Sequence, residues 1–278
     1  MKPVLVSFGS SDLEWSLHRF RKQATRSQLF SRVVVLTESD LDQEFRNKFE
    51  PFLKKEVRGF GYWIWKPQSV YQVIKQLPPG TLVIYLDLGC HIFPDRYFSW
   101  EAFYDLCLQS SSGLVAFQDD PLDPIALKDS LERVWTKGDL FNYFHVREEA
   151  AITDTPQFAA AVFGLVVGAE SLRFVESWLR PFFADISLVD DSPSQSSNLP
   201  GFLEHRFDQS IFSILCKISE CSVLPQDLLQ GRKFDADVHG VSSVPWIVAR
   251  DNAGPLVSGL KWLRLVLKRP KETVFCAR

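Results

Sequence analysis

The ten residues Thr81 to Cys90, TLVIYLDLGC, decide the fold of this chain. Leu82 to Leu86 are apolar or aromatic without interruption, between the turn residues Pro78-Pro79-Gly80 and Gly89. A run of this length between turn residues predicts a strand that is buried on both faces. Asp87 follows at the carboxyl end of that strand, where open α/β sheets bind their ligands. A turn or N-cap aspartate is the alternative role for Asp87.

The segment before this strand joins three aromatic rings to one lysine. Residues 61–67 read GYWIWKP, with Lys66 as the only cation among them. Pro67 belongs in the first turn of a predicted helix. The apolar residues of that helix recur at the spacing of one helix face, at Val70, Ile74 and Leu77.

The order of aromatic loop, helix, tight turn, buried strand and acidic tip resembles nucleotide-sugar glycosyltransferases of the GT-A fold. The motifs GYWxWKP and YLDxGC are similar to those of bacterial surface-polysaccharide transferases. The resemblance implies a single α/β domain over residues 1–278, with a GT-A-like (Rossmann-like) mixed, mostly parallel sheet flanked by helices. It also implies donor contacts for three residues: Tyr62, Lys66 at a phosphate or sugar, and Asp87 at the diphosphate, a metal ion or the ribose.

The acidic motif departs from the family at one position. An Asp-x-Asp motif would begin at Asp87, but Gly89 stands where its second aspartate belongs. In the family the carboxylates hold a divalent cation that offsets the charge of the leaving group. Mg²⁺ needs only one or two carboxylates when phosphates and waters complete its shell, so Mn or Mg is still expected at Asp87. The family also implies a second metal ligand, His239. The alternative to metal binding at Asp87 is direct contact of its carboxylate with ribose or sugar hydroxyls.

Two further stretches supply candidates for donor binding. Residues Val4–Phe8 predict a strand, and a helix and then a second buried strand, Arg32–Thr37, are predicted after it. This βαβ opening favours a parallel sheet. The loop after the first strand would face the nucleotide, which makes Ser7 and Phe8 candidates. Lys137 lies at the start of a predicted helix, where binding of a phosphate is favoured. The stretch around it, WTKGDLF, also resembles the transferases. The alternative is that Lys137 is a solvated surface lysine.

A second cluster of ionisable residues, Glu204–Ser210 (EHRFDQS), directly precedes an apolar helix. GT-A enzymes of the glycogenin type carry an Asp-Gln pair here, which implies catalytic roles for Asp208 and Gln209 and acceptor contacts for His205 and Arg206. A carboxylate at this place is a general base in an inverting reaction, or it orients the donor sugar in a retaining one. A helix cap at Asp208 and surface pairing of His205 and Arg206 with Glu204 are the alternatives.

Composition bounds the remaining possibilities. The chain has 278 residues, 46% of them hydrophobic, and a net charge of −3, which disfavours the basic surface that nucleic-acid binding requires. No signal-peptide h-region is recognised, and no stretch reaches the roughly 20 apolar residues of a membrane span. The five cysteines form no CxxC pair, so a reducing cytoplasm is expected.

Two segments stand apart from the predicted core. Residues 185–201, rich in serine and acidic residues, predict a flexible loop. Residues 256–278 form a basic carboxyl-terminal segment, in which 260–271 interleave five basic residues with Trp262 and leucines. This pattern predicts peripheral contact with an anionic membrane surface, at the inner face of the membrane. A core-docked helix with snorkelling lysines is the alternative.

The function expected from the sequence is therefore that of a hexosyltransferase. It would move a sugar from a nucleotide sugar, with UDP as the expected nucleotide, to a glycan or lipid-linked glycan in polysaccharide biosynthesis. Because Gly89 weakens the acidic motif, the alternative is a non-catalytic sugar-nucleotide or glycan-binding module on a degenerate transferase fold. The sequence leaves open the donor sugar, the acceptor, the anomeric outcome, the metal dependence and the oligomeric state.

Overall fold

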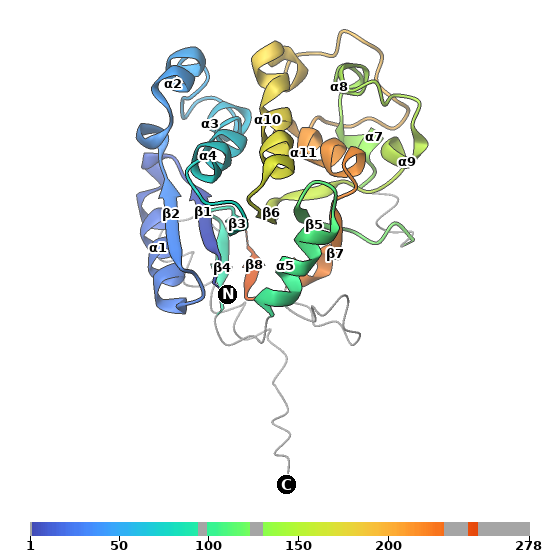
Figure 1. The fold of residues 1–278 in the computed structure, drawn as a ribbon. Helices are drawn as coiled ribbons and strands as arrows, with labels where there is room; N and C mark the ends of the chain where they lie inside the picture. Colours follow the sequence, from blue (N-terminus) through green and yellow to red (C-terminus); the bar gives the residue numbers. More distant parts are fainter. Residues whose placement is uncertain (1, 94–98, 123–129, 231–243, 250–278) are drawn as a thin grey trace.

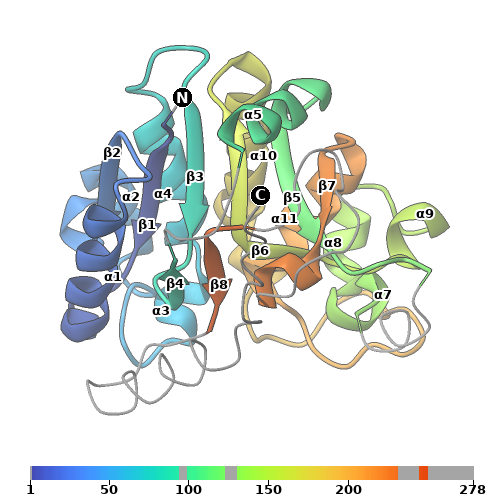
Figure 2. The ribbon, with the colours of Figure 1, turned by 90° about the horizontal axis from the view of Figure 1, so that it is seen from below.

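The computed structural model describes residues 2–93, 99–122, 130–230 and 244–249, and these residues are built around a six-stranded sheet. The strand order is β2-β1-β3-β6-β5-β7 (Figure 2). The strands are β1 (Val4–Phe8), β2 (Arg32–Leu36), β3 (Leu82–Leu86), β5 (Leu114–Gln118), β6 (Phe158–Val166) and β7 (Ser222–Pro225). Of these strands, β6 runs antiparallel to β3 and β5, while the other pairs are parallel. The predicted mixed, mostly parallel sheet is confirmed.

Helices cover both faces of this sheet. On one face lie α4 (Trp65–Ile74), α10 (Ala169–Ala184) and α11 (Phe207–Ile218), which are grouped together in Figure 1. On the other lie α1 (Glu14–Ser27) and α5 (Trp100–Gln109). Val83 and Tyr85 of β3 belong to the first layer of core, whereas Ile84 belongs to the second. Because both faces are covered, all five residues of β3 are buried, and the prediction of a doubly buried strand is confirmed.

Shorter elements surround the sheet. They are the helices α2 (Gln43–Phe49), α3 (Gly59–Tyr62), α7 (Glu132–Trp135), α8 (Gly138–Tyr143) and α9 (Ala150–Thr153), and the 3₁₀ turns η1 (Ser11–Leu13), η2 (Glu38–Asp40), η3 (Ile186–Leu188) and η4 (Gln226–Gln230). A second, two-stranded antiparallel sheet pairs β4 (Cys90–Ile92) with β8 (Trp246–Val248). Within the described ranges, no helix combines the length and apolar character needed to cross a bilayer.

The second strand differs from its prediction in burial. β2 lies at the edge of the sheet, where Arg32 is exposed and the other four residues are half-buried. The prediction of a fully buried strand at this position is wrong, because an edge strand has a neighbour on one side alone. Its four apolar residues pack only partly against the core.

The serine-rich segment 185–201 is fastened to the start of α8. Asp139 accepts hydrogen bonds from the backbone N–H groups of Gln195 and Ser196, at 2.8 and 2.6 Å. The side chain of Asn198 accepts another from the N–H of Gly138, at 2.8 Å. These contacts position the segment that the sequence predicts to be flexible. His239 and the basic segment 256–278 lie outside the described residues.

Candidate active site

A cavity of about 1040 Å³ opens at the carboxyl ends of β1 and β3. Because these two strands are parallel neighbours, their ends bring the loop after Phe8 beside the loop after Leu86. The remaining walls come from the loop before α3, from Gln157 at the start of β6, and from residues 204–209 at the start of α11. The cavity therefore lies at the sheet edge that the sequence predicts for ligand binding.

Lys66 lies at the floor of this cavity, between two carboxylates. Its Nζ is 3.2 Å from Oδ1 of Asp87 and 3.0 Å from Oδ2 of Asp208. Nζ also donates a hydrogen bond to the carbonyl of Ala160, at 3.3 Å. The three charged groups come from α4, from the loop after β3 and from α11, so the sheet and two helices of one layer jointly fix their geometry. Lys66 and Asp208 are buried, while the Asp87 side chain keeps 30% of its surface exposed.

Burial and charge act against each other on these groups. Burial would lower the pKa of the Lys66 ammonium, but the charges of Asp208 and then Asp87 outweigh burial and raise this pKa. Burial raises the pKa of Asp208 to about 6, although Lys66 acts in the opposite direction. Lys66 is therefore a fixed positive charge, and Asp208 is a carboxyl group that changes protonation near neutral pH.

Aromatic rings form a wall of the cavity next to these charges. Trp65 stacks on Phe8 with 4.3 Å between ring centroids, and Trp63 stacks on Phe207 at 5.3 Å. The guanidinium of Arg58 lies over the ring of Phe207, 4.8 Å from its centroid. Flat apolar faces beside a cation suit a ligand that combines a planar or ring-shaped group with an anion.

Strained backbone is concentrated at the same wall. Phe60 and Trp63 have φ values of 55° and 59°, and Phe207 has φ of 46°. Residues other than glycine seldom adopt this left-handed region, and such residues cluster at ligand-binding sites. The strain here is compatible with a wall whose rings are held in a set orientation.

His205 contributes a neutral hydrogen-bond donor. Burial, together with the charge of Lys137, lowers the pKa of its imidazole to about 3. Nδ1 accepts a hydrogen bond from the backbone N–H of Lys137, at 3.3 Å, so the ring proton belongs on Nε2. Among the described residues Nε2–H finds no partner. His205 lines this cavity and also the separate cavity beside Lys137, while Nε2 itself is buried.

The structure brings seven of the residues predicted from the sequence to the cavity. They are Phe8, Lys66, Asp87, His205, Arg206, Asp208 and Gln209. Arg206 stacks on the ring of Trp135, with 3.6 Å between the guanidinium carbon and the ring centroid. The N-cap residue of α11 is Arg206, so the structure does not support the alternative in which Asp208 is merely the cap.

Three predicted donor-binding residues lie elsewhere. Ser7 is fully buried within β1 and does not line the cavity. Tyr62 packs behind the wall, where its ring stacks on Phe207 at 5.5 Å. Lys137 lines a separate cavity of about 500 Å³, pairs with Asp190 at 3.3 Å and donates to the carbonyl of Ser187 at 2.9 Å. The alternative of a solvated surface lysine is wrong, since Lys137 is buried.

Among the cavity residues that the sequence analysis did not predict are Arg58, Trp135 and Gln157. Arg58 pairs with Glu204, which the sequence had placed with His205 and Arg206. Gln157 accepts a hydrogen bond at Oε1 from Nε2 of Gln209, at 3.3 Å. No local pattern marks Arg58 or Gln157, and Trp135 belongs to the WTKGDLF stretch, in which the sequence analysis chose only Lys137.

The described residues do not by themselves fit a divalent cation at Asp87. Oδ1 of Asp87 already contacts the ammonium of Lys66 and accepts a hydrogen bond from the hydroxyl of Tyr85, at 2.8 Å. A metal ion bound there would face the positive charge of Lys66 at close range. In the part of the chain that the structure describes, no group of three or more His, Cys, Asp or Glu side chains gathers to hold a metal. The second predicted ligand, His239, lies outside that part.

No protein-family model matches the chain, and no curated protein matches it either. Solved structures with a similar course of the chain include several glycosyltransferases. Mouse xyloside xylosyltransferase 1 in its apo form is 12% identical over 92% of this chain and 100% of that chain, with a TM-score of 0.44.

A glycosyltransferase involved in the glycosylation of the major capsid of PBCV-1 is 9% identical over 96% of this chain and 100% of that chain, with a TM-score of 0.46. An active-site mutant of LgtC is 10% identical over 80% of this chain and 72% of that chain, with a TM-score of 0.41. At these identities the likeness concerns the fold alone.

Proposed function

We propose that this chain is a glycosyltransferase that moves a sugar from a nucleotide-sugar donor, with UDP as the nucleotide, to a glycan or lipid-linked glycan. The observation that carries this proposal is the buried Lys66 ammonium, held between Asp87 and Asp208 at the floor of a cavity with an aromatic wall. A fixed cation suits the charge that develops on a departing diphosphate. The two carboxylates suit sugar or ribose hydroxyls, and the rings suit the faces of a base or sugar.

Each charged group then has a defined task in the transfer. The bond between the anomeric carbon and the diphosphate oxygen breaks, the electron pair leaves with the diphosphate, and Lys66 stabilises the added negative charge. The acceptor hydroxyl oxygen forms the new bond to the anomeric carbon. When attack comes from the face opposite the leaving group, the hydroxyl proton passes to Asp208, whose pKa of about 6 suits a base at neutral pH. When attack comes from the same face, the leaving diphosphate takes that proton and Asp208 orients the sugar.

The cation required at the diphosphate is part of the chain itself in this proposal. Lys66 Nζ lies 3.2 Å from Oδ1 of Asp87, the carboxylate at which the sequence resemblance implies a divalent ion. The nucleoside diphosphate should consequently bind without added metal. If His239 does supply a metal ligand, EDTA will weaken this binding.

A screen of nucleotide sugars tests the function. The chain is incubated with UDP-, GDP-, ADP- and CMP-linked sugars, and release of the nucleotide is followed by chromatography with and without glycan acceptors. The test variant is Asp87→Asn in the cavity, and its matched control is Asp105→Asn, at an exposed carboxylate on α5. Turnover in the wild type and in Asp105→Asn, with loss in Asp87→Asn, supports the proposal. Binding without turnover for any donor or acceptor would favour the non-catalytic module, and the absence of both would refute the nucleotide-sugar site.

A further inference from the structure

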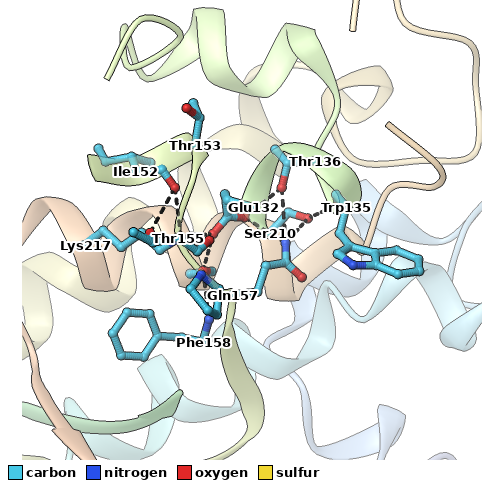
Figure 3. A network of polar contacts seen from close by, with 12 residues as sticks. Glu132, Trp135, Thr136, Ile152, Thr153, Thr155, Gln157, Phe158, Ser210 and Lys217 are labelled. Atoms are coloured by element: carbon cyan, nitrogen blue, oxygen red, sulfur yellow. Dashed lines mark hydrogen bonds and ion pairs between the residues drawn. The ribbon is translucent and has the colours of Figure 1, made fainter. Parts of the chain in front are cut away.

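A buried carboxylate beside the cavity fixes the direction in which one side-chain amide points. Glu132, on α7, is fully buried and is surrounded by hydrogen-bond donors (Figure 3). Thr136 and Gln157 donate to Oε1, both at 2.7 Å. Ser213 and Lys217 of α11 donate to Oε2, the latter at 2.8 Å. An ion-paired carboxylate only accepts hydrogen bonds, so every neighbour must present a donor to it.

This arrangement leaves one orientation for the Gln157 amide. Its Nε2 faces Oε1 of Glu132, and it lies 3.2 Å from the hydroxyls of both Thr136 and Ser210. The Thr136 hydroxyl proton is used toward Glu132, and the Ser210 hydroxyl proton is used toward the carbonyl of Trp135. The carboxylate of Glu132 and these two hydroxyls therefore all act as acceptors toward the Gln157 amide. A flipped amide would set its carbonyl oxygen against three acceptors in a buried site, which is unfavourable.

The orientation of Gln157 in turn fixes that of Gln209. Because Gln157 points its NH₂ group at Glu132, its Oε1 faces the cavity side and accepts from Nε2 of Gln209, at 3.3 Å. Gln209 makes no other side-chain hydrogen bond within the described part of the chain, and it is only half-buried. Its Oε1 consequently remains as an acceptor on the cavity, next to Asp208.

We propose that Glu132 and Gln157 are positioning residues which make Gln209 present its carbonyl oxygen to the cavity, where it accepts a hydrogen bond from a sugar hydroxyl. The inference rests on the proposed function for the identity of the ligand, but the orientation itself does not. It assigns to Gln157 a role that acts only through Gln209. The hydrogen bonds run from Gln209 to Gln157 and from Gln157 to Glu132. Through them the buried charge of Glu132 sets the orientation of an uncharged glutamine that lines the cavity.

Substitutions separate this role from a merely structural one. Gln157→Met keeps the volume and removes the amide. Ser213→Ala removes a donor to the same Glu132 and the acceptor of the Phe158 backbone N–H, but Ser213 makes no hydrogen bond to the side chain of Gln157 or Gln209. Gln157→Met should lower kcat/KM for nucleotide-sugar turnover roughly tenfold, the worth of one oriented hydrogen bond. Ser213→Ala should leave kcat/KM nearly unchanged even if both variants lose similar stability.

The double variant Gln157→Met with Gln209→Ala provides the decisive comparison. Because Gln157 acts through Gln209, the double variant should be no slower than Gln209→Ala alone. If the two losses multiply instead, Gln157 acts on the reaction by another route and the inference is refuted. Donor hydrolysis that falls together with transfer assigns the hydroxyl to the donor sugar; loss in transfer alone assigns it to the acceptor.

Side-chain amide NMR tests the orientation without any turnover. In the ¹⁵N-glutamine-labelled protein, the Gln209 NH₂ signals are assigned by their absence in Gln209→Glu. They should shift in Gln157→Met and stay in place in Ser213→Ala. Unchanged Gln209 signals in Gln157→Met would overturn the inference. A shift in a protein that turns over no nucleotide sugar would uphold the orientation and refute the proposed function alone.

If Gln157→Met does not fold, Gln209→Glu serves in its place, because residue 209 is half-buried at the cavity. Glutamate keeps an acceptor oxygen there but sets another acceptor against Oε1 of Gln157. The ratio of kcat/KM in Gln209→Glu to kcat/KM in the wild type should be low at pH values where this glutamate is ionised. It should rise where the glutamate is protonated, since the protonated form again has a donor for Gln157, and the wild-type profile corrects for the protonation of Asp208. A loss in kcat/KM that is the same at all pH values contradicts the inference.

Discussion

In the proposed reaction, proton transfer is assigned to Asp208, a buried carboxyl group in contact with Lys66. Burial raises its pKa to about 6 while Lys66 remains in contact with it. As a general base it must be ionised, so kcat/KM should fall about tenfold per pH unit below pH 6. Asp208→Asn should lose roughly 10²- to 10⁴-fold in turnover while retaining donor affinity.

The measurement for Asp208 is a pH–rate profile of the wild type together with calorimetric donor binding by Asp208→Asn. Asparagine keeps the size of the side chain, so it separates a role in proton transfer from one in packing. Near-wild-type turnover in Asp208→Asn contradicts a base at this position. A profile without an acidic limb would instead assign Asp208 to orientation of the donor sugar.

Lys66 carries a stability prediction as well as a functional one. Removing one member of a buried ion pair leaves an unpaired charge and typically costs about 3–5 kcal/mol. The pKa of Asp208 is raised in the folded chain above its value in the unfolded chain, so protonation favours folding, and this stabilisation is lost as pH rises through about 6. Lys66→Met should therefore lower the free energy of unfolding strongly at pH 8 and less at pH 5.

Urea unfolding of Lys66→Met and wild type at the two pH values measures this difference. Lys75→Met, on an exposed lysine at the end of the same helix, is the matched control. An equal loss of stability for Lys66→Met at pH 5 and pH 8 would contradict the coupling between Lys66 and Asp208.

Sequence reasoning finds residues of this kind when a local pattern exposes them. Asp87 follows a strand, and Asp208 stands in the first turn of an apolar helix, so both could be predicted. That Lys66 would lie between them depends on how α4 and α11 pack on the sheet. Gln157 and Glu132 could not be predicted, because their roles arise from contacts between residues 25 to 85 positions apart.

At the scale of elements, the packing of α5 on β6 depends on a glycine. A Cβ atom at Gly164 would lie 2.1 Å from the ring of Phe103, which is fully buried, and 3.0 Å from Ile84. The absence of a side chain at Gly164 thus allows α5 to approach the strand closely. Gly164→Ala should destabilise the chain by roughly 1–3 kcal/mol through overpacking.

Thermal or urea unfolding checks this, with Gly168→Ser as control. Gly168 has open space around it and is the N-cap residue of α10, where serine is favoured. The control should be neutral or slightly stabilising. If Gly164→Ala is equally neutral, α5 does not pack against β6 as described.

The positions of individual strands along the chain are the part of the fold that the sequence predicts best. β1 and β3 occupy the predicted residues, because turn residues or a change of polarity bound each run. The antiparallel direction of β6 and the edge position of β2 could not be predicted. Both depend on how strands far apart in the sequence are ordered in the sheet, and a single strand's apolar pattern carries no information about that order.

At the scale of the whole molecule, the predicted membrane contact of residues 260–271 is open to a direct test. Near an anionic surface each basic residue contributes about 1 kcal/mol, so five can attach a protein reversibly. Co-sedimentation with anionic vesicles should exceed that with neutral vesicles and decrease at high salt, because salt shortens the Debye length. A chain ending before Leu260 should lose this binding. Equal binding to both vesicle types, or unfolding of the shortened chain, contradicts an electrostatic anchor.

The central claim is that the cavity at the ends of β1 and β3 binds a nucleoside diphosphate through the charge of Lys66 and the carboxylate of Asp87. Isothermal titration with UDP in the presence of EDTA tests it most directly, using wild type, Asp87→Asn, Lys66→Met and the surface control Asp105→Asn. The account predicts one binding site in wild type and Asp105→Asn without any metal, and affinity weakened at least about tenfold in the two cavity variants. Absence of binding by wild type to any nucleoside diphosphate, or equal affinity in all four proteins, would contradict it.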